Sequence, residues 1–144
     1  SICENLLDSE GVLRVLSLDP AVEHVLQLGL RTNEDGVSLM VDPRTSEKLI
    51  TELDRFGEQM MLESLQPVLL CSGSLRRHLR KLLERVLPHI SVISMNEIPW
   101  TINIASYGII AIERSIIERD RVAESRNLPE PASAESNTNL QGAN

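Results

Sequence analysis

Residues 67–99 read PVLLCSGSLRRHLRKLLERVLPHISVISMNEIP. The apolar run at 68–71 is typical of a strand that is buried on both faces. The Ser-Gly-Ser segment at 72–74 supplies a turn and a helix N-cap, and Pro88 ends the helix that follows. A second strand begins at Ile90. This strand–helix–strand order predicts half of an α/β domain.

The helix predicted between residues 74 and 87 is amphipathic. Its apolar residues recur at helical spacing on one side, which we expect to face the core: Leu75, Leu79, Leu82, Leu83, Val86 and Leu87. We expect a single core to join this helix to the strands on either side through Cys71, Leu79, Leu83, Val92 and Ile93.

The rest of the chain alternates strand and helix patterns. Asp19-Pro20 and Asp42-Pro43 each predict a helix start, because Asp caps the helix and proline suits its first position. Gly29 is expected to end the first of these helices. Further strands are predicted at 12–18, 37–41 and 102–110. The predicted fold class is therefore α/β, with a mixed sheet of about four to five strands and packed helices.

We divide the chain into three parts. Residues 1–10 are expected to be the end of a preceding helical subdomain, and residues 11–112 a C-terminal α/β subdomain. Residues 113–144 are expected to form a charged helix and then a disordered tail, whose last part has almost no apolar content. We expect no secretory signal in the first residues, and no apolar run approaches the roughly 18 residues of a membrane helix.

The composition limits the function. The 144 residues carry a net charge of −7, and Phe, Tyr and Trp together make up 2%. The isoelectric point is near 5.0. Such a chain lacks both the positive charge and the stacking rings that nucleic-acid binding needs. We therefore expect no nucleic-acid partner and no contact of this part of the chain with a membrane.

Cysteine and histidine are sparse. Cys3 and Cys71 lie far apart in the sequence, and neither shows ligand spacing with His24, His78 or His89. Two separate thiols fit a reducing cytosol. We expect no metal site and no cofactor.

One alternative is an enzyme. Cys71 and Arg77 are separated by five residues at a strand-to-helix turn, which is the spacing of cysteine-dependent phosphatases. Those enzymes usually have His before the Cys and Ser or Thr after the Arg, whereas this chain has Leu70 and His78. No Asp is evident as a general acid. We favour the interpretation that Cys71 closes a core strand, and we predict no catalytic residue.

The predicted helix also concentrates positive charge in Arg76, Arg77, Arg80, Lys81 and Arg85. One interpretation is the solvated face of an amphipathic helix. The other is a docking face for an acidic partner. Arg76 and Arg77 fall in the first turn, where the helix dipole disfavours cations, so acidic neighbours should compensate them, within the domain or across an interface. These five residues form the candidate partner-binding site.

The Asn-Glu-Ile-Pro-Trp segment at 96–100 is expected to be structural. Ile98 and Trp100 should cover the edge of the core, and Glu97 should cap a turn or pair with a nearby Arg. Glu97 has no carboxylate or His partner at a usable spacing for catalysis.

The chain resembles a known family along residues 1–110. The segment quoted first is similar to the C-terminal signature of the FHIPEP family, the bacterial type III export gate proteins shared by flagella and virulence injectisomes. The similar motifs are PVLLC at 67–71, Arg76-Arg77, Leu83-Glu84-Arg85, Leu87-Pro88, Val92-Ile93-Ser94 and Asn96-Glu97-Ile98. Upstream matches are Leu13-Arg14-Val15, Leu18-Asp19-Pro20, Glu23 and Val41-Asp42-Pro43.

The resemblance implies a non-enzymatic domain of a larger export gate protein. Members of the family are multi-pass inner-membrane proteins whose C-terminal half lies on the cytoplasmic side, where it forms a nonameric ring. The ring receives chaperone–substrate complexes and other export apparatus proteins, including ATPase-stalk components and the substrate-specificity switch protein, and passes substrates to the channel. The family's best-known chaperone pocket lies in earlier subdomains, so none of its residues is carried over.

One finer point concerns the branch of the family. Val41-Asp42-Pro43 and the long helix after it favour an injectisome over a flagellum. A third interpretation, beside the export gate and the phosphatase, is a generic regulatory binding domain whose likeness to export gates is superficial.

Overall fold

The computed structural model describes residues 2–112. The charged helix and the tail predicted for 113–144 lie outside these residues, and the division of the chain into subdomains stays a prediction. The described part begins with a short 3-10 helix, η1 (Ile2–Leu6), where the sequence predicts the end of a helix. Within the described part, no helix is both long and apolar enough to cross a membrane.

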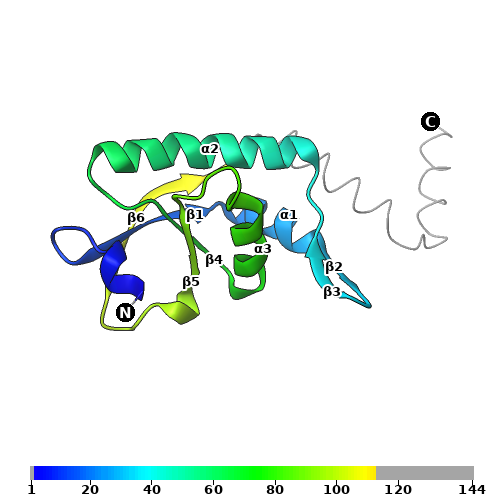
Figure 1. The fold of residues 1–144 in the computed structure, drawn as a ribbon, viewed down its shortest axis with the longest axis horizontal. Coiled ribbons are helices and arrows are strands. Elements are labelled where there is room, and N and C mark those ends of the chain that lie inside the picture. The colour runs from blue at the N-terminus through cyan, green and yellow to red at the C-terminus, as the bar shows by residue number, and fades with distance from the viewer. Residues whose placement is uncertain (1, 113–144) are drawn as a thin grey trace, which may run out of the picture.

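The centre of the fold is a four-stranded sheet (Figure 1). Its strands are β1 (Val12–Leu18), β4 (Val68–Cys71), β5 (Ser91–Ser94) and β6 (Asn103–Ile110), in the order β5-β4-β1-β6. Every pairing in this sheet is parallel. The predicted α/β class is confirmed. The sheet itself is parallel and not mixed. Helical crossovers return the chain from β1 to β4 and from β4 to β5 in the same direction, whereas β5 is joined to β6 by a 3-10 turn (Met95–Glu97) and a loop.

Three helices accompany the sheet: α1 (Pro20–Leu28), α2 (Pro43–Leu62) and α3 (Gly73–Leu83). The two Asp-Pro helix starts are confirmed. The Asp19 carboxylate accepts from the backbone N–H of Ala21 over 3.0 Å, and Asp42 accepts in the same way from Arg44 over 2.8 Å. In both helices the proline occupies one of the first positions, where no intrahelical donor is lost.

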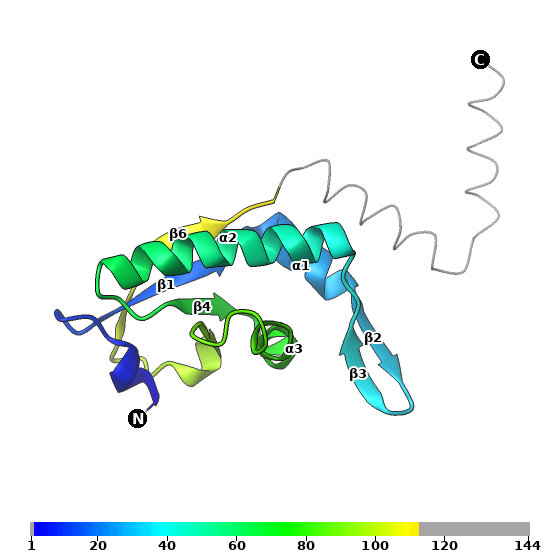
Figure 2. The ribbon, with the colours of Figure 1, turned by 45° about the horizontal axis from the view of Figure 1, so that its top comes forward.

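The two central strands, β1 and β4, are buried on both faces of the sheet, as the apolar run in β4 predicts, whereas the edge strand β6 is largely exposed. On one face Leu69 and Cys71 pack with buried residues of all three helices. On the other, Val68 packs with Leu13, Val15 and Ile93. Residues after η1 and after β5 cover this second face, on the side of the sheet away from α2 (Figure 2).

One core prediction is therefore wrong. Ile93 was expected in the same cluster as Cys71, Leu79, Leu83 and Val92, but it lies in the cluster on the opposite face. The reason is strand geometry, since the neighbouring residues Val92 and Ile93 must point to opposite sides of the sheet. The sequence shows that both are buried, and only the structure shows that there are two cores.

A separate two-stranded hairpin projects beside α3, built from β2 (Leu30–Asn33) and β3 (Gly36–Leu39) (Figures 1 and 2). The sequence predicts a strand at 37–41 as part of the main sheet and a helix stop at Gly29, but no strand at 30–33.

Gly29 does end α1, although its φ of −84° is one that any residue can adopt. A Cβ on Gly29 would instead collide with the Met40 carbonyl oxygen, so glycine is required for the close approach at the hairpin base.

Helix α3 ends four residues before the predicted boundary. The backbone turns after Leu83, with the N–H groups of Val86 and Leu87 both donating to the Leu83 carbonyl. Val86, expected on the inner face, is 52% exposed, whereas Leu87 is buried. Pro88 contributes to this early end, because it disfavours helical backbone at Leu87 and has no N–H to continue the helix. The helix phase is otherwise confirmed, because Leu75, Leu79 and Leu83 are all buried.

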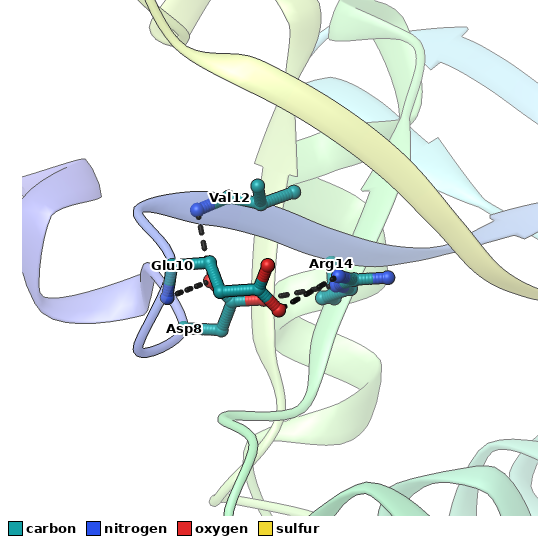
Figure 3. A network of polar contacts seen from close by, with 4 residues as sticks. All are labelled: Asp8, Glu10, Val12 and Arg14. Carbon is teal, nitrogen blue, oxygen red and sulfur yellow. Dashed lines mark hydrogen bonds and ion pairs between the residues drawn. The ribbon is translucent and has the colours of Figure 1, made fainter.

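The entry into β1 is fixed by the Asp8 side chain (Figure 3). One carboxylate oxygen accepts from the backbone N–H groups of Glu10 and Val12 over 2.8 and 2.9 Å. The other accepts from Nε of Arg14 over 2.9 Å. Gly11 completes this turn with a φ of +77°, which other residues rarely adopt.

Candidate partner-binding site

Helix α3 separates apolar and charged residues onto two sides. Leu75, Leu79 and Leu83 are buried against the sheet, and α3 and β5 lie in direct contact. Arg77, Arg80 and Lys81 are exposed on the remainder of the helix. The helix carries four Lys or Arg residues and no Asp or Glu between Gly73 and Leu83. Positive charge is therefore concentrated on one element of a chain that is acidic as a whole.

Arg76 differs from the other four candidate residues because it is bound within the domain. Its Nε donates to Oε1 of Glu97 over 2.6 Å, and both side chains are only about 30% exposed. Glu97 also accepts from the backbone N–H of Ser94 over 2.8 Å, which completes a capping box. The predicted role of Glu97, to cap a turn and pair with an Arg, is confirmed. This pair compensates Arg76 for its unfavourable place in the first turn of α3.

The pKa of Glu97 reflects this balance. Burial raises the pKa of the carboxyl group, but hydrogen bonds from Arg76 and Ser94 act in the opposite direction and leave it below its ordinary value. Glu97 is therefore a fixed negative charge that holds Arg76. Because Arg76 is held in this ion pair, we assign it a structural role and do not count it among the residues available to a partner.

The other four candidates define what we call the basic face: Arg77, Arg80, Lys81 and Arg85. Arg85 lies in the turn after α3 and not on the helix, because the helix ends at Leu83. All four are exposed. Within residues 2–112, none of the four has an ion-pair partner. Their assignment to partner binding stays a prediction.

An open cavity of about 370 Å³ lies between the hairpin, the start of α2 and α3, and we call it the hairpin groove. Its apolar lining is made by Val37, Leu39, Val41 and Leu82. Its polar lining is made by Ser38, Ser46, His78 and Lys81. Sequence reasoning missed this groove because it missed strand β2, without which the hairpin wall cannot be placed beside α3.

The phosphatase interpretation of Cys71 is contradicted. Cys71 is buried, and burial, with the nearby Glu23 carboxylate, raises the pKa of its thiol to about 12. A nucleophilic cysteine needs the opposite shift. The backbone N–H of Ser72, which would hold a phosphate oxygen, instead donates to Oε2 of Glu23 over 3.1 Å. A carboxylate thus occupies the position that an anionic substrate would need.

The loop after β5 departs from expectation at one residue. Ile98 packs on the sheet as predicted, but Trp100 is 94% exposed and does not cover the core. The N–H of Ile102 donates to the Pro99 carbonyl over 3.1 Å, and this tight turn puts Trp100 at the outer corner.

In the described part of the chain, no three His, Cys, Asp or Glu side chains are grouped so that they could hold a metal ion.

The fold and the candidate site together define an α/β domain with an exposed basic surface. The FHIPEP family model matches residues 1–103. The chain belongs to the FHIPEP family, so its likeness to that family is not superficial.

Among curated relatives, the chain is 32% identical over 101 residues to the flagellar biosynthesis protein FlhA of Bacillus subtilis. It is 30% identical over 112 residues to the low calcium response locus protein D of Yersinia pestis. These matches cover 70% and 77% of this chain but only 15% and 16% of the relatives. The chain therefore corresponds to a small part of each.

Solved structures share the fold. The Chlamydia pneumoniae CdsV protein matches with a TM-score of 0.65 and 28% identity, over 76% of this chain and 31% of CdsV. A complex of CdsV with CdsO from the same organism matches with a TM-score of 0.62 and 27% identity, over 76% of this chain and 32% of that one. A nonameric SctV-C assembly from EPEC has the same fold, with a TM-score of 0.62 at 24% identity, over 76% of this chain and 32% of that one.

Proposed function

We propose that this chain is part of the cytosolic C-terminal domain of a type III secretion export gate protein. Its family membership and its fold support this assignment. In this proposal the domain has no enzymatic role and contributes to a ring on the cytoplasmic side of the bacterial inner membrane. The ring receives secretion chaperone–substrate complexes and passes substrates to the export channel.

The observation that carries the proposed role of this part is the basic face. Arg77, Arg80 and Lys81 are exposed on a helix without acidic residues, within a chain of net charge −7. Surface cations that are not paired within their own domain are available to a negatively charged partner and speed its association. We propose that the basic face docks an acidic surface of a chaperone–substrate complex, of another export apparatus protein or of the adjoining subunit.

Two solved structures with the same fold support the proposal that the partners are other export apparatus proteins and further copies of the gate protein. One solved structure is a complex of CdsV with a second protein, CdsO, and another is a nonamer of SctV-C. By analogy, the parent of this chain forms a nonameric ring that also binds other export apparatus proteins.

We further propose the injectisome branch on the basis of Val41-Asp42-Pro43 and the 20-residue helix α2 that follows. Complementation of strains lacking the flagellar or the injectisome gate protein would test that step.

The docking role is tested by charge reversal in the parent protein. Arg80→Glu with Lys81→Glu should leave the fold intact, because both side chains are exposed and lie off the apolar stripe. We expect secretion to fall, together with binding of chaperone–substrate complexes or of the adjoining subunit. Binding should fall most clearly at low salt, where screening is least.

Arg55→Glu is the matched control. Arg55 lies over the ring of Phe56 on α2, where it pairs with Glu52. Its reversal changes the local charge by the same amount per residue at a site outside the basic face. If the double variant folds, assembles and secretes at the level of the control, the basic face is only solvated surface and the docking proposal fails.

A further inference from the structure

The hairpin groove joins an apolar wall to the basic face. Val37 lines the groove from the hairpin side and is 42% exposed, so its side chain is incompletely covered in this structure. Opposite, His78, Lys81 and Leu82 line the groove from α3. These three positions follow i, i+3 and i+4 spacing and therefore form one stripe along the helix.

The basic face continues from this stripe. Arg77 is four residues before Lys81 and three before Arg80, so the three cations are neighbours on the helix surface. Lys81 belongs both to the groove and to the basic face. A ligand that entered the groove would thus meet apolar side chains together with the positive charge of Lys81, and the other cations of the basic face lie beside Lys81 on the helix.

We infer that the hairpin groove binds an acidic segment of a partner protein through one bulky apolar side chain, while the flanking carboxylates of that segment contact the basic face. This inference rests on the proposed docking function and adds the place and chemistry of recognition. Charge complementarity selects the occupant, because none of the eight residues that line the groove is acidic and the adjacent exposed cations are unpaired within residues 2–112. The volume, about 370 Å³, is within the range of sites that enclose a ligand group.

The two contributions can be separated with synthetic peptides. The probe is a short fluorescein-labelled peptide in which a single leucine is flanked by glutamates, and its match has serine in place of that leucine. Binding to the full chain is measured by fluorescence anisotropy at low salt. We expect the leucine peptide to bind about three- to tenfold more tightly than the serine peptide, as for burial of one apolar side chain.

Variants of the chain complete a double-mutant cycle. Val37→Ser replaces one of the four apolar residues that line the groove, at an exposed position of the hairpin, and should weaken binding of the leucine peptide by about three- to tenfold. It should leave the serine peptide unchanged, because that peptide has no group to place in the groove. The double variant Arg77→Glu with Arg80→Glu should weaken the binding of both peptides by about tenfold or more. Thermal melting checks that each variant is folded.

The outcomes distinguish this inference from the proposed function. If charge reversal weakens both peptides but Val37→Ser affects neither, the groove inference is overturned and the docking role of the basic face stands. If neither set of variants changes binding, both fail. Amide resonances of Val37 and Leu39 that shift with protein concentration in the absence of peptide would identify a second copy of the chain as the occupant, and would also overturn the inference.

Discussion

The Nε atom of Arg76 lies 2.6 Å from Oε1 of Glu97, and this ion pair ties the first turn of α3 to the 3-10 turn that follows β5. The pair spans the carboxyl ends of two adjacent parallel strands, β4 and β5. Because Glu97 also accepts from Ser94, a single carboxylate organises both turns.

Replacing Glu97 should therefore destabilise the domain. Glu97→Gln removes the charge that holds Arg76 and weakens the cap on Ser94, and we expect a loss of roughly 1–3 kcal/mol in the free energy of unfolding. Urea denaturation measures it. In a cycle with Arg76→Gln, the two changes should couple by roughly 0.5–1.5 kcal/mol, since both groups are partly exposed. Additive effects would show that the ion pair contributes nothing to stability.

Cys71 should be chemically inert in the folded protein. Burial raises the pKa of its thiol to about 12, against an ordinary value of 9.0, so very little thiolate is present near pH 8. In a Cys3→Ser background, we expect Cys71 to react with a disulfide reagent on the order of a hundred to a thousand times more slowly than after unfolding.

The same residue provides a test of the non-enzymatic assignment. Neither the native chain nor Cys71→Ser should hydrolyse an aryl phosphate, because the thiol is protonated and Glu23 lies at the loop where phosphate would bind. Hydrolysis that disappears in Cys71→Ser would restore the phosphatase interpretation.

Asp8 should make stability depend on pH in the acid range. Its hydrogen bonds from the Val12 N–H and the Arg14 side chain lower the pKa of the carboxyl group below the ordinary value of 3.8. The unfolded state then binds the proton more readily, so this contribution is present above pH 3.8 and is lost as pH falls through the lower folded value.

Comparison with Asp8→Asn isolates this contribution from other carboxyl groups. The native chain should be more stable than Asp8→Asn at pH 7, and the difference should shrink as pH falls below 3.8. Thermal unfolding of both proteins across this range measures it. A difference that stays constant with pH would mean that the Asp8 charge has no part in holding the turn.

The base of the hairpin should be intolerant of a side chain at Gly29. A methyl group there would collide with the Met40 carbonyl oxygen, while the Met40 N–H donates to the Gly29 carbonyl over 2.8 Å. We expect Gly29→Ala to cost roughly 1–3 kcal/mol, the usual cost of overpacking. Gly73→Ala is the control, since its nearest neighbour, Asn96, leaves ordinary contact distance. Equal melting temperatures for the two variants would show that the hairpin base is loosely packed.

Local interactions determined what could be read from the sequence by itself. The caps at Asp19 and Asp42 act on a backbone N–H only two residues away, so the helix starts were predictable from short motifs. The buried stripe of α3 follows from helical spacing alone. The α/β class followed from the order of these local patterns along the chain, and the family from the resemblance of short motifs such as PVLLC at 67–71.

Only the tertiary structure decided which distant residues meet. Arg76 and Glu97 are 21 residues apart, and the sequence required an acidic neighbour for Arg76 without showing that it lies within the domain. The division into two cores depends on the pleat of the sheet, which places Ile93 opposite Val92. The hairpin groove needs β3 and α3 side by side, about 40 residues apart in the chain. Such contacts are stabilised by packing across the whole domain, and no local pattern of residues encodes them.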